Sequence, residues 1–286
     1  MSHERVPAQA GRFYPSSRTE CESMLDEFVA GAKKRDGIAA IIPHAGWVYS
    51  GATAALGIAG VAETPADTVV VFGAVHVQTR SEASLWAKGV WRTPLGAMDI
   101  DEELAAGIAT CDHVSVDESA HLREHAIEVE VPLIQRLLGD KRIVPLMVRP
   151  GPNGPEIGRQ CAEKARELGK KVVFLGSTDL THYGPGFGFE PEGRGATGIR
   201  WAKEVNDRRF VKLIEELNAP AVVPEATARR NACGAGAVAA TIGAALEFGA
   251  TRYEELAHTS SAEIEIAEGG YPLNSVGYEA GIFLTK

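Results

Sequence analysis

The sequence predicts an α/β fold with parallel strands, and three observations support this prediction. Short apolar runs, often rich in β-branched residues, at 37–42, 68–71 and 142–148 have the length and composition of buried strands. Segments with helical spacing of apolar residues lie between the runs. A helix at 155–168, between the strand at 142–148 and a strand at 171–175, completes a βαβ unit, which predicts parallel strands joined by a right-handed crossover. No linker divides the 286 residues, so we expect one domain over residues 1–286.

The remaining elements follow from caps, breakers and periodicity along the chain. The segments expected to be helical are 17–34, which Ser17 can cap, the small-residue segment after Gly51, 102–108, a segment that reaches about Leu138, 199–217 and 234–248. Residues 83–100 are expected to form a hairpin, and the glycine-rich residues 185–198 a flexible loop over the site. The segments 253–260 and 275–284 are expected to be two further strands that complete the sheet.

Polar side chains suited to metal or proton chemistry follow three of the predicted strands. Pro43 ends the first strand because it has no N–H to give to a sheet, and His44 comes next. His76 follows the second strand, and Asp179 and His182 follow the strand of the βαβ unit. The carboxyl edge of a sheet is where open α/β folds gather their ligands. Two neutral imidazoles and one anionic ligand would be enough to hold a divalent metal there, with His182 as an acid or base held by Asp179 or a nearby polar group.

Of the four cysteines, Cys233 stands apart because it lies at the N-terminal end of a predicted helix. A helix N-terminus lowers the pKa of a thiol and favours the thiolate, the form that binds metals. The cysteines are far apart and lack CxxC spacing, so the sequence predicts neither a zinc ribbon nor a dithiol redox motif. We therefore expect Cys233 to lie at the same sheet edge as His44, His76, Asp179 and His182, where a thiolate is one possible anionic ligand.

The segment that contains His121, His125 and Glu128 leaves two interpretations open. Their spacings of four and three residues would place all three on one helical face if the helix began this early, an arrangement that can imitate a metal site. The commoner explanation is a solvated face, or residues that support metal ligands from behind. We therefore expect His125 and Glu128 to lie around the site rather than to bind the metal.

Composition and charge argue against several classes of function. The net charge of -9 and the absence of a compensating basic run argue against nucleic-acid binding. No apolar run is long enough to cross a bilayer, and the N-terminus lacks an apolar signal-peptide core, so we expect a cytoplasmic protein without a membrane partner. P-loop and GxSxG signatures are absent, which disfavours a Walker-type nucleotide site and a serine hydrolase.

Five motifs, in this order along the chain, resemble those of the Memo family, known in prokaryotes as AmmeMemoRadiSam system protein B. They are residues 10–15 (AGRFYP), 43–51 (PHAGWVYSG), 124–132 (EHAIEVEVP), 177–184 (STDLTHYG) and 232–234 (ACG). The resemblance covers nearly the whole chain. The segment 73–76 is a looser match to the family pattern, but it keeps the histidine.

The resemblance implies a fold similar to that of class III extradiol ring-cleaving dioxygenases, with a central mixed sheet flanked by helices. Those enzymes hold non-haem iron(II) with two histidines and a glutamate, and use another histidine as acid–base catalyst. Carried onto this sequence, His44 and His76 match the two histidine ligands. Cys233 stands where the glutamate would be, and His182 matches the catalytic histidine. A thiolate is softer than a carboxylate, so we expect iron first, with copper or zinc as alternatives.

These features predict a non-haem metal-dependent oxidoreductase of unspecified substrate. The alternative is a non-catalytic module that holds a peptide or small molecule on an inherited enzyme scaffold, working with radical SAM and AMMECR1-like proteins as the system's name implies. Aromatic residues would then line the pocket, although core packing is the other explanation for them. They are Tyr14, Trp47, Tyr49 and Tyr183. Hydrolytic zinc chemistry would suit an open metal position, but nothing in the sequence selects a scissile bond.

Overall fold

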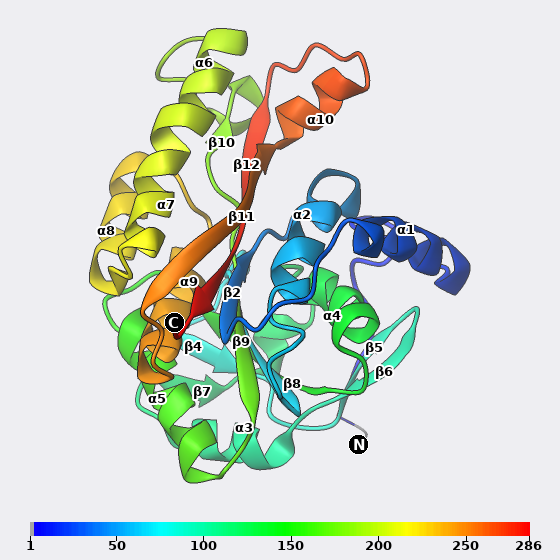
Figure 1. Ribbon diagram of the computed structural model, residues 1–286, viewed down its shortest axis with the longest axis vertical. Helices are drawn as coiled ribbons and strands as arrows, with labels where there is room; N and C mark the ends of the chain where they lie inside the picture. The colour runs from blue at the N-terminus through cyan, green and yellow to red at the C-terminus, as the bar shows by residue number, and fades with distance from the viewer. Residues whose placement is uncertain (1–2) are drawn as a thin grey trace.

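The centre of the structure, a computed structural model that describes residues 3–286, is a large mixed β-sheet (Figure 1). Its strand order is β10-β12-β2-β9-β3-β8-β4-β7, and β11 pairs with β12. The strands of the protein are β1 (Glu4–Arg5), β2 (Ala39–Ile42), β3 (Thr68–Gly73), β4 (Ala83–Leu85), β5 (Val90–Thr93), β6 (Gly96–Asp99), β7 (Val114–Val116), β8 (Arg142–Val148), β9 (Val172–Ser177), β10 (His182–Tyr183), β11 (Arg252–Ser260) and β12 (Ser275–Leu284).

Four adjacent strands at the centre of the sheet, β2, β9, β3 and β8, are parallel to their neighbours. All residues of β2, β3 and β9 and nearly all of β8 are buried. The sequence explains this central position, because an apolar run without alternation is typical of a strand that is buried on both faces. The strands β12 and β11 extend the sheet in antiparallel orientation. The predicted α/β fold, with a central, mostly parallel mixed sheet, is therefore confirmed, as are the βαβ unit and the two C-terminal strands.

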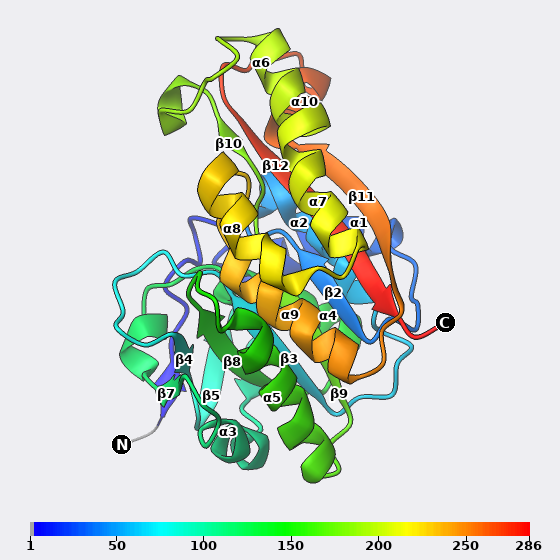
Figure 2. The same ribbon diagram turned by 90° about the vertical axis from the view of Figure 1, so that its left-hand side faces the viewer.

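Helices cover both faces of this sheet (Figure 2). The α-helices are α1 (Arg18–Ala30), α2 (Trp47–Ala59), α3 (Glu102–Ile108), α4 (Val131–Leu138), α5 (Gly154–Glu167), α6 (Ala196–Trp201), α7 (Arg208–Glu215), α8 (Ala219–Arg229), α9 (Ala235–Glu247) and α10 (Ser261–Ala267). On one face α2 contacts β2 and β12, and on the other α9 contacts β9, β2 and β3. The helices α5 and α9 pack closely because Gly158 has no side chain; a Cβ there would lie 1.8 Å from the carbonyl oxygen of Ala240.

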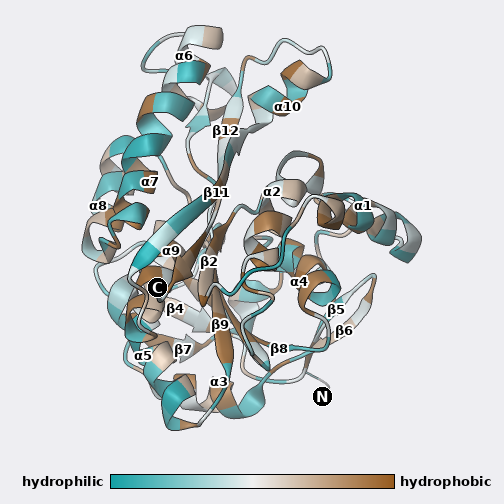
Figure 3. Cartoon of the chain, viewed as in Figure 1, coloured by the Kyte–Doolittle hydropathy of each residue, from teal (hydrophilic) through white to brown (hydrophobic). Residues whose placement is uncertain are grey.

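Hydropathy follows this layering: the central strands are hydrophobic, and hydrophilic residues lie on the peripheral helices (Figure 3). Among residues 3–286, no helix combines the length and the apolar character that crossing a bilayer would require.

Some expected helix boundaries are wrong. The segment before α4 forms only short 3₁₀ turns at Glu118–His121 and Glu128–Glu130, so a continuous helix does not begin as early as His121. The expected helix 199–217 is interrupted by a π-helical turn at Ala202–Asp207, in which Asn206 and Asp207 are buried. The short helix α10 was not expected from the sequence.

The predicted hairpin of residues 83–100 contains β5 and β6, which pair with each other in antiparallel orientation. They form a separate three-stranded sheet with β1 rather than extending the central sheet. The N-terminal segment is therefore attached to the body of the protein through β5.

His121 is buried in this region, away from the metal-ligand candidates. Its Nε2 bonds the carbonyl oxygen of Ser84 at 2.8 Å, its Nδ1 has no partner among residues 3–286, and its ring meets those of Trp86 and Trp91 edge-on. Burial lowers the pKa of His121 to about 4. Of the two interpretations that the sequence leaves open, the one that places His121 on a helical face shared with His125 and Glu128 is therefore excluded.

This buried imidazole should make the protein sensitive to acid. Between about pH 6.5 and pH 4 the unfolded chain binds a proton at His121 and the folded protein does not, so the free energy of unfolding should fall as pH falls, by up to about 3 kcal/mol. A His121→Gln variant should show a smaller loss over this range in urea unfolding at pH 7, 6 and 5. An unchanged pH dependence in the variant would contradict this assignment.

The strand register brings the candidate site residues together. Ile42 at the end of β2 pairs with Ser177 at the end of β9, and Phe72 of β3 pairs with Gly176. The carboxyl ends of these three strands are therefore level, and the residues that follow them share one edge of the sheet.

Candidate metal centre

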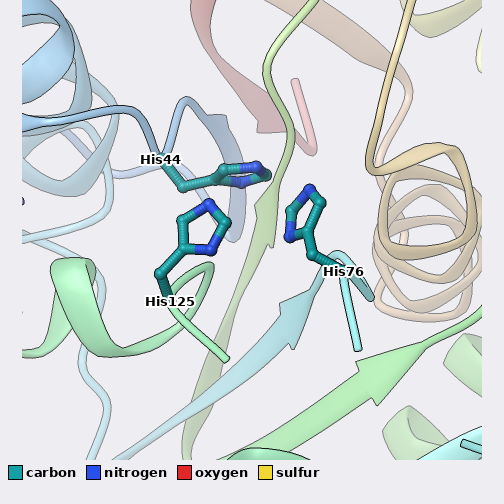
Figure 4. A group of neighbouring side chains, drawn as sticks. All are labelled: His44, His76 and His125. Carbon is teal, nitrogen blue, oxygen red and sulfur yellow. The ribbon is translucent and has the colours of Figure 1, made fainter. Parts of the chain in front are cut away.

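Three histidines converge at this carboxyl edge (Figure 4). His44 follows β2, His76 follows β3, and His125 lies in the loop before α4. Each offers a ring nitrogen, and the three nitrogens lie within 4.8 Å of one another. Bonds from nitrogen to zinc are about 2.1 Å, which puts two nitrogens of a tetrahedral site about 3.4 Å apart, so the rings would need to move inward to bind one ion.

The ring of His44 is held in one tautomer by a short chain of hydrogen bonds. The carbonyl oxygen of Ala126 can only accept, so the hydroxyl of Ser177 donates to it at 2.9 Å. The same hydroxyl then accepts from the Nδ1–H of His44 at 2.7 Å, which leaves the lone pair on Nε2. Burial, followed by the charges of His76 and His125, lowers the pKa of His44 well below its usual value. His44 is therefore a neutral imidazole, the form that binds metals.

The carboxylate of Glu124 holds the other two histidines. Its Oε1 lies 2.9 Å from Nδ1 of His76 and 3.2 Å from Nδ1 of His125. It also accepts backbone N–H bonds from His76, His125 and Ala126. Burial would raise the pKa of Glu124, but the contacts with His125 and His76 outweigh it and hold the pKa well below its usual range. With Nδ1 facing a carboxylate in both rings, both Nε2 atoms are free to bind a metal.

The two rings that Glu124 holds lie on the solvent-accessible side of the histidine cluster. The side chain of His76 is 33% exposed and that of His125 is 20% exposed, whereas His44 is only 1% exposed. The donor set therefore fits a divalent metal: three imidazole rings are oriented by acceptors behind them, and one side is open to a ligand.

Replacing Glu124 by glutamine should weaken metal binding by about 10- to 100-fold, because the charge that orients His76 and His125 is lost while the side chain keeps its size. Competition with a chromophoric chelator measures this change. The matched control is Glu82→Gln, since Glu82 contacts His113 at the surface. Equal affinities of wild type and Glu124→Gln would refute the role of Glu124.

Cys233 lies directly beside the three histidines. Its sulfur is 3.2 Å from Nε2 of His44 and accepts the backbone N–H of Asp179 at 3.3 Å. Burial, and then the charge of Asp179, raise the pKa of the Cys233 thiol. The expectation that the N-terminus of the following helix favours a thiolate is therefore wrong for the metal-free protein, because burial outweighs the helix. The sulfur is nevertheless placed to contact an ion that binds His44.

Asp179 and His182 share a cavity of about 360 Å³ with His125, but they bond to different groups. One carboxylate oxygen of Asp179 accepts the backbone N–H of His44 at 2.8 Å. Nδ1 of His182 bonds the carbonyl oxygen of Leu180 at 3.0 Å, so a neutral His182 has its Nε2 available. Burial raises the pKa of Asp179, which brings proton exchange at this carboxyl closer to neutral pH.

The structure places the predicted supporting residues in different surroundings. Of the aromatics, Tyr49 lines the cavity, whereas the Tyr14 and Tyr183 hydroxyls bond Glu128 and the Gly193 carbonyl oxygen. Trp47 is buried and donates its indole N–H to the Val129 carbonyl oxygen at 2.9 Å. These three aromatics therefore each have a structural hydrogen bond to a group other than the metal-ligand candidates.

Glu128 is a buried anchor for the N-terminal segment. Its carboxylate pairs with Arg5 at 2.7 Å and accepts N–H bonds from Ala8 and Gln9, in addition to the hydroxyl of Tyr14. The side chains of Arg5 and Glu128 are each 1% exposed. Glu128 therefore ties the loop that carries His125 to the segment that precedes α1.

Sequence reasoning did not single out Glu124 or Ser177, and it placed His125 outside the set of ligands. A usable signal was present for Glu124, since a carboxylate directly before a histidine can hold ligand rings. The signal for Ser177 was its position at the end of a buried strand, next to the strand that ends before His44.

Comparisons with known proteins agree over almost the whole chain. A family model described as Memo-like protein matches residues 5–282. A MEMO1 family protein of Methanosarcina barkeri is 37% identical over 267 residues, which cover 91% of this chain and 94% of that protein. One of Thermococcus onnurineus is 33% identical over 292 residues, covering 98% and 99%. A crystal structure of an uncharacterized protein of Escherichia coli K12 covers 84% of this chain at 15% identity, with a TM-score of 0.49.

Proposed function

The chain belongs to the family of Memo-like proteins, and from this premise we propose that it is a metal-binding protein with an open site for oxidoreductase chemistry. The observation that carries the proposal is the convergence of His44, His76 and His125, each with its second ring nitrogen facing an acceptor. Such preorganisation distinguishes a ligand set from histidines that merely pack together.

The side chains around the metal have separate tasks in this proposal. The three histidines hold the ion, Glu124 and Ser177 orient them, and Cys233 offers a sulfur beside His44. Imidazole nitrogens with one sulfur suit iron, copper or zinc, and iron(II) is the metal to test first. A bound redox-active metal would supply a Lewis acid and an electron-transfer centre in the cavity.

We propose that His182 and Asp179 transfer protons to and from the bound ligand. Both line the cavity that contains His125, and Nε2 of a neutral His182 can take a proton from a bound ligand while Nδ1–H stays bonded to Leu180. One carboxylate oxygen of Asp179 accepts the backbone N–H of His44, and the other is available to a ligand in the cavity. The two groups bond different partners, but the charge of His182 acts on the carboxyl of Asp179.

Metal retention by untagged protein is the first test. Protein purified without a histidine tag, then loaded anaerobically with iron(II), should bind one equivalent by mass spectrometry of metals, and more firmly than Cys233→Ala. Loaded wild type should consume dioxygen with at least one of a panel of catechols. The variant His182→Gln should keep the metal and lose this turnover. Absence of metal binding in wild type would refute the site, and full turnover in His182→Gln would refute its role.

A further inference from the structure

The cavity beside the three histidines has walls of a distinct composition. It holds about 360 Å³, enough for one small ring compound, and four aromatic side chains line it: Phe13, Tyr49, Phe187 and Tyr278. The ring of Phe13 lies 4.5 Å from that of His125, and the ring of Phe187 lies 5.1 Å from that of His182. Aromatic faces and edges thus flank the two pocket histidines.

Apart from the histidines, whose charge depends on their protonation, every formally charged side chain that lines the cavity is negative. The lining residues include two carboxylates, Asp179 and Glu265, and no lysine or arginine in the part of the chain that the structure describes. Arginines occur nearby but face elsewhere. Arg230 bonds backbone carbonyl oxygens and lies over the ring of Phe189, and Arg12 lines a neighbouring hollow of about 620 Å³ that shares Phe13 and Tyr49.

Both carboxylates have unused hydrogen-bonding capacity. Asp179 is only 5% exposed, and its second carboxylate oxygen has no protein partner within residues 3–286, although the residue lines the cavity. Glu265, half-buried on α10, makes neither a hydrogen bond nor an ion pair with its side chain in the same range. The carboxylate oxygen of a nearly buried residue that has no protein partner is free to accept a hydrogen bond from a ligand, so a cationic donor would be favourable there.

We propose that the ligand of this cavity is an aromatic amine cation, whose ring packs between the aromatic walls and whose ammonium group faces Asp179 and Glu265. The proposal rests on the proposed function, because it names the class of compound that the metal site would act on. Aromatic faces attract cations, and the two carboxylates supply the counter-charge. In the metal-free protein, an aromatic carboxylate of the same size would meet like charge and no lysine or arginine on the cavity walls.

Three phenols of nearly equal size and different charge test this inference: tyramine as the cation, 4-ethylphenol as the neutral compound and 4-hydroxyphenylacetate as the anion. Their dissociation constants are measured by ligand-observed NMR on the metal-free full chain, because a bound metal would add positive charge beside the cavity. Tyramine should bind at least about 10-fold more tightly than 4-hydroxyphenylacetate, with 4-ethylphenol between them. The preference should fall severalfold in Glu265→Gln and stay unchanged in Glu268→Gln, an exposed position three residues away that does not line the cavity.

The outcomes separate this inference from the proposed function. Equal binding of cation and anion, preference for the anion, absence of tyramine binding at millimolar concentration, or an unchanged preference in Glu265→Gln would each overturn the inference. If the protein binds metal and shows one of these results, only the ligand class is wrong. If the cation preference holds in protein that binds no metal, the proposed metal site is wrong and the cavity's charge selectivity stands.

Discussion

Replacing His125 by alanine is expected to lower the affinity for iron(II) more than about 100-fold. Loss of a group that merely orients a ligand costs about 10- to 100-fold, and His125 itself supplies one of the three converging nitrogens. Anaerobic competition with a chromophoric chelator measures the affinity. The fold should survive, because the His125 side chain is 20% exposed and borders the cavity.

The surface variant His113→Ala is the matched control for this measurement. His113 is exposed and contacts Glu82, so its removal should leave iron affinity unchanged. If His125→Ala binds iron as well as His113→Ala does, His125 is not a ligand. The site would then reduce to His44, His76 and Cys233, the set that the sequence predicts.

Replacing Glu128 by alanine is expected to lower the free energy of unfolding by about 3–5 kcal/mol. The substitution leaves the guanidinium of Arg5 buried without its carboxylate, 4.2 Å above the Trp91 ring, and removes the acceptor of Tyr14. Arg5 also donates to the carbonyl oxygen of Glu124, so the loss should reach the loop that carries two of the metal-site residues. Urea unfolding at neutral pH measures the change.

An exposed ion pair from the same region provides the control. Glu4 pairs with Arg92 at 3.0 Å at the surface, and Glu4→Ala should cost less than about 1 kcal/mol. A loss of similar size in both variants would contradict the assignment of Glu128 as a buried anchor.

The features that the sequence predicts well are those that depend on local pattern. The buried runs that became β2, β3, β8 and β9 need only composition and length to be recognised, and the residues that follow them lie at one sheet edge because parallel strands end together. His44 and His76 could be paired from this rule alone, without knowledge of any side-chain contact.

The features that the sequence does not predict depend on the path of irregular backbone. His125 enters the cluster because residues 122–127 form a loop rather than a helix. Arg5, from the distant N-terminal segment, holds that loop by pairing with Glu128 and donating to the carbonyl oxygen of Glu124. No periodicity signals such a path. The thiol of Cys233 was expected to be acidic from its helix, but burial at the end of the sheet acts more strongly and raises the pKa.

The central claim is that His44, His76 and His125 bind one metal ion, and anomalous X-ray scattering from crystals of zinc- or iron-loaded protein tests it most directly. The account predicts a single strong anomalous peak within bonding distance of the Nε2 atoms of all three histidines, with the sulfur of Cys233 beside it. A peak elsewhere, a peak that His125 does not contact, or no peak in fully loaded crystals would contradict the claim.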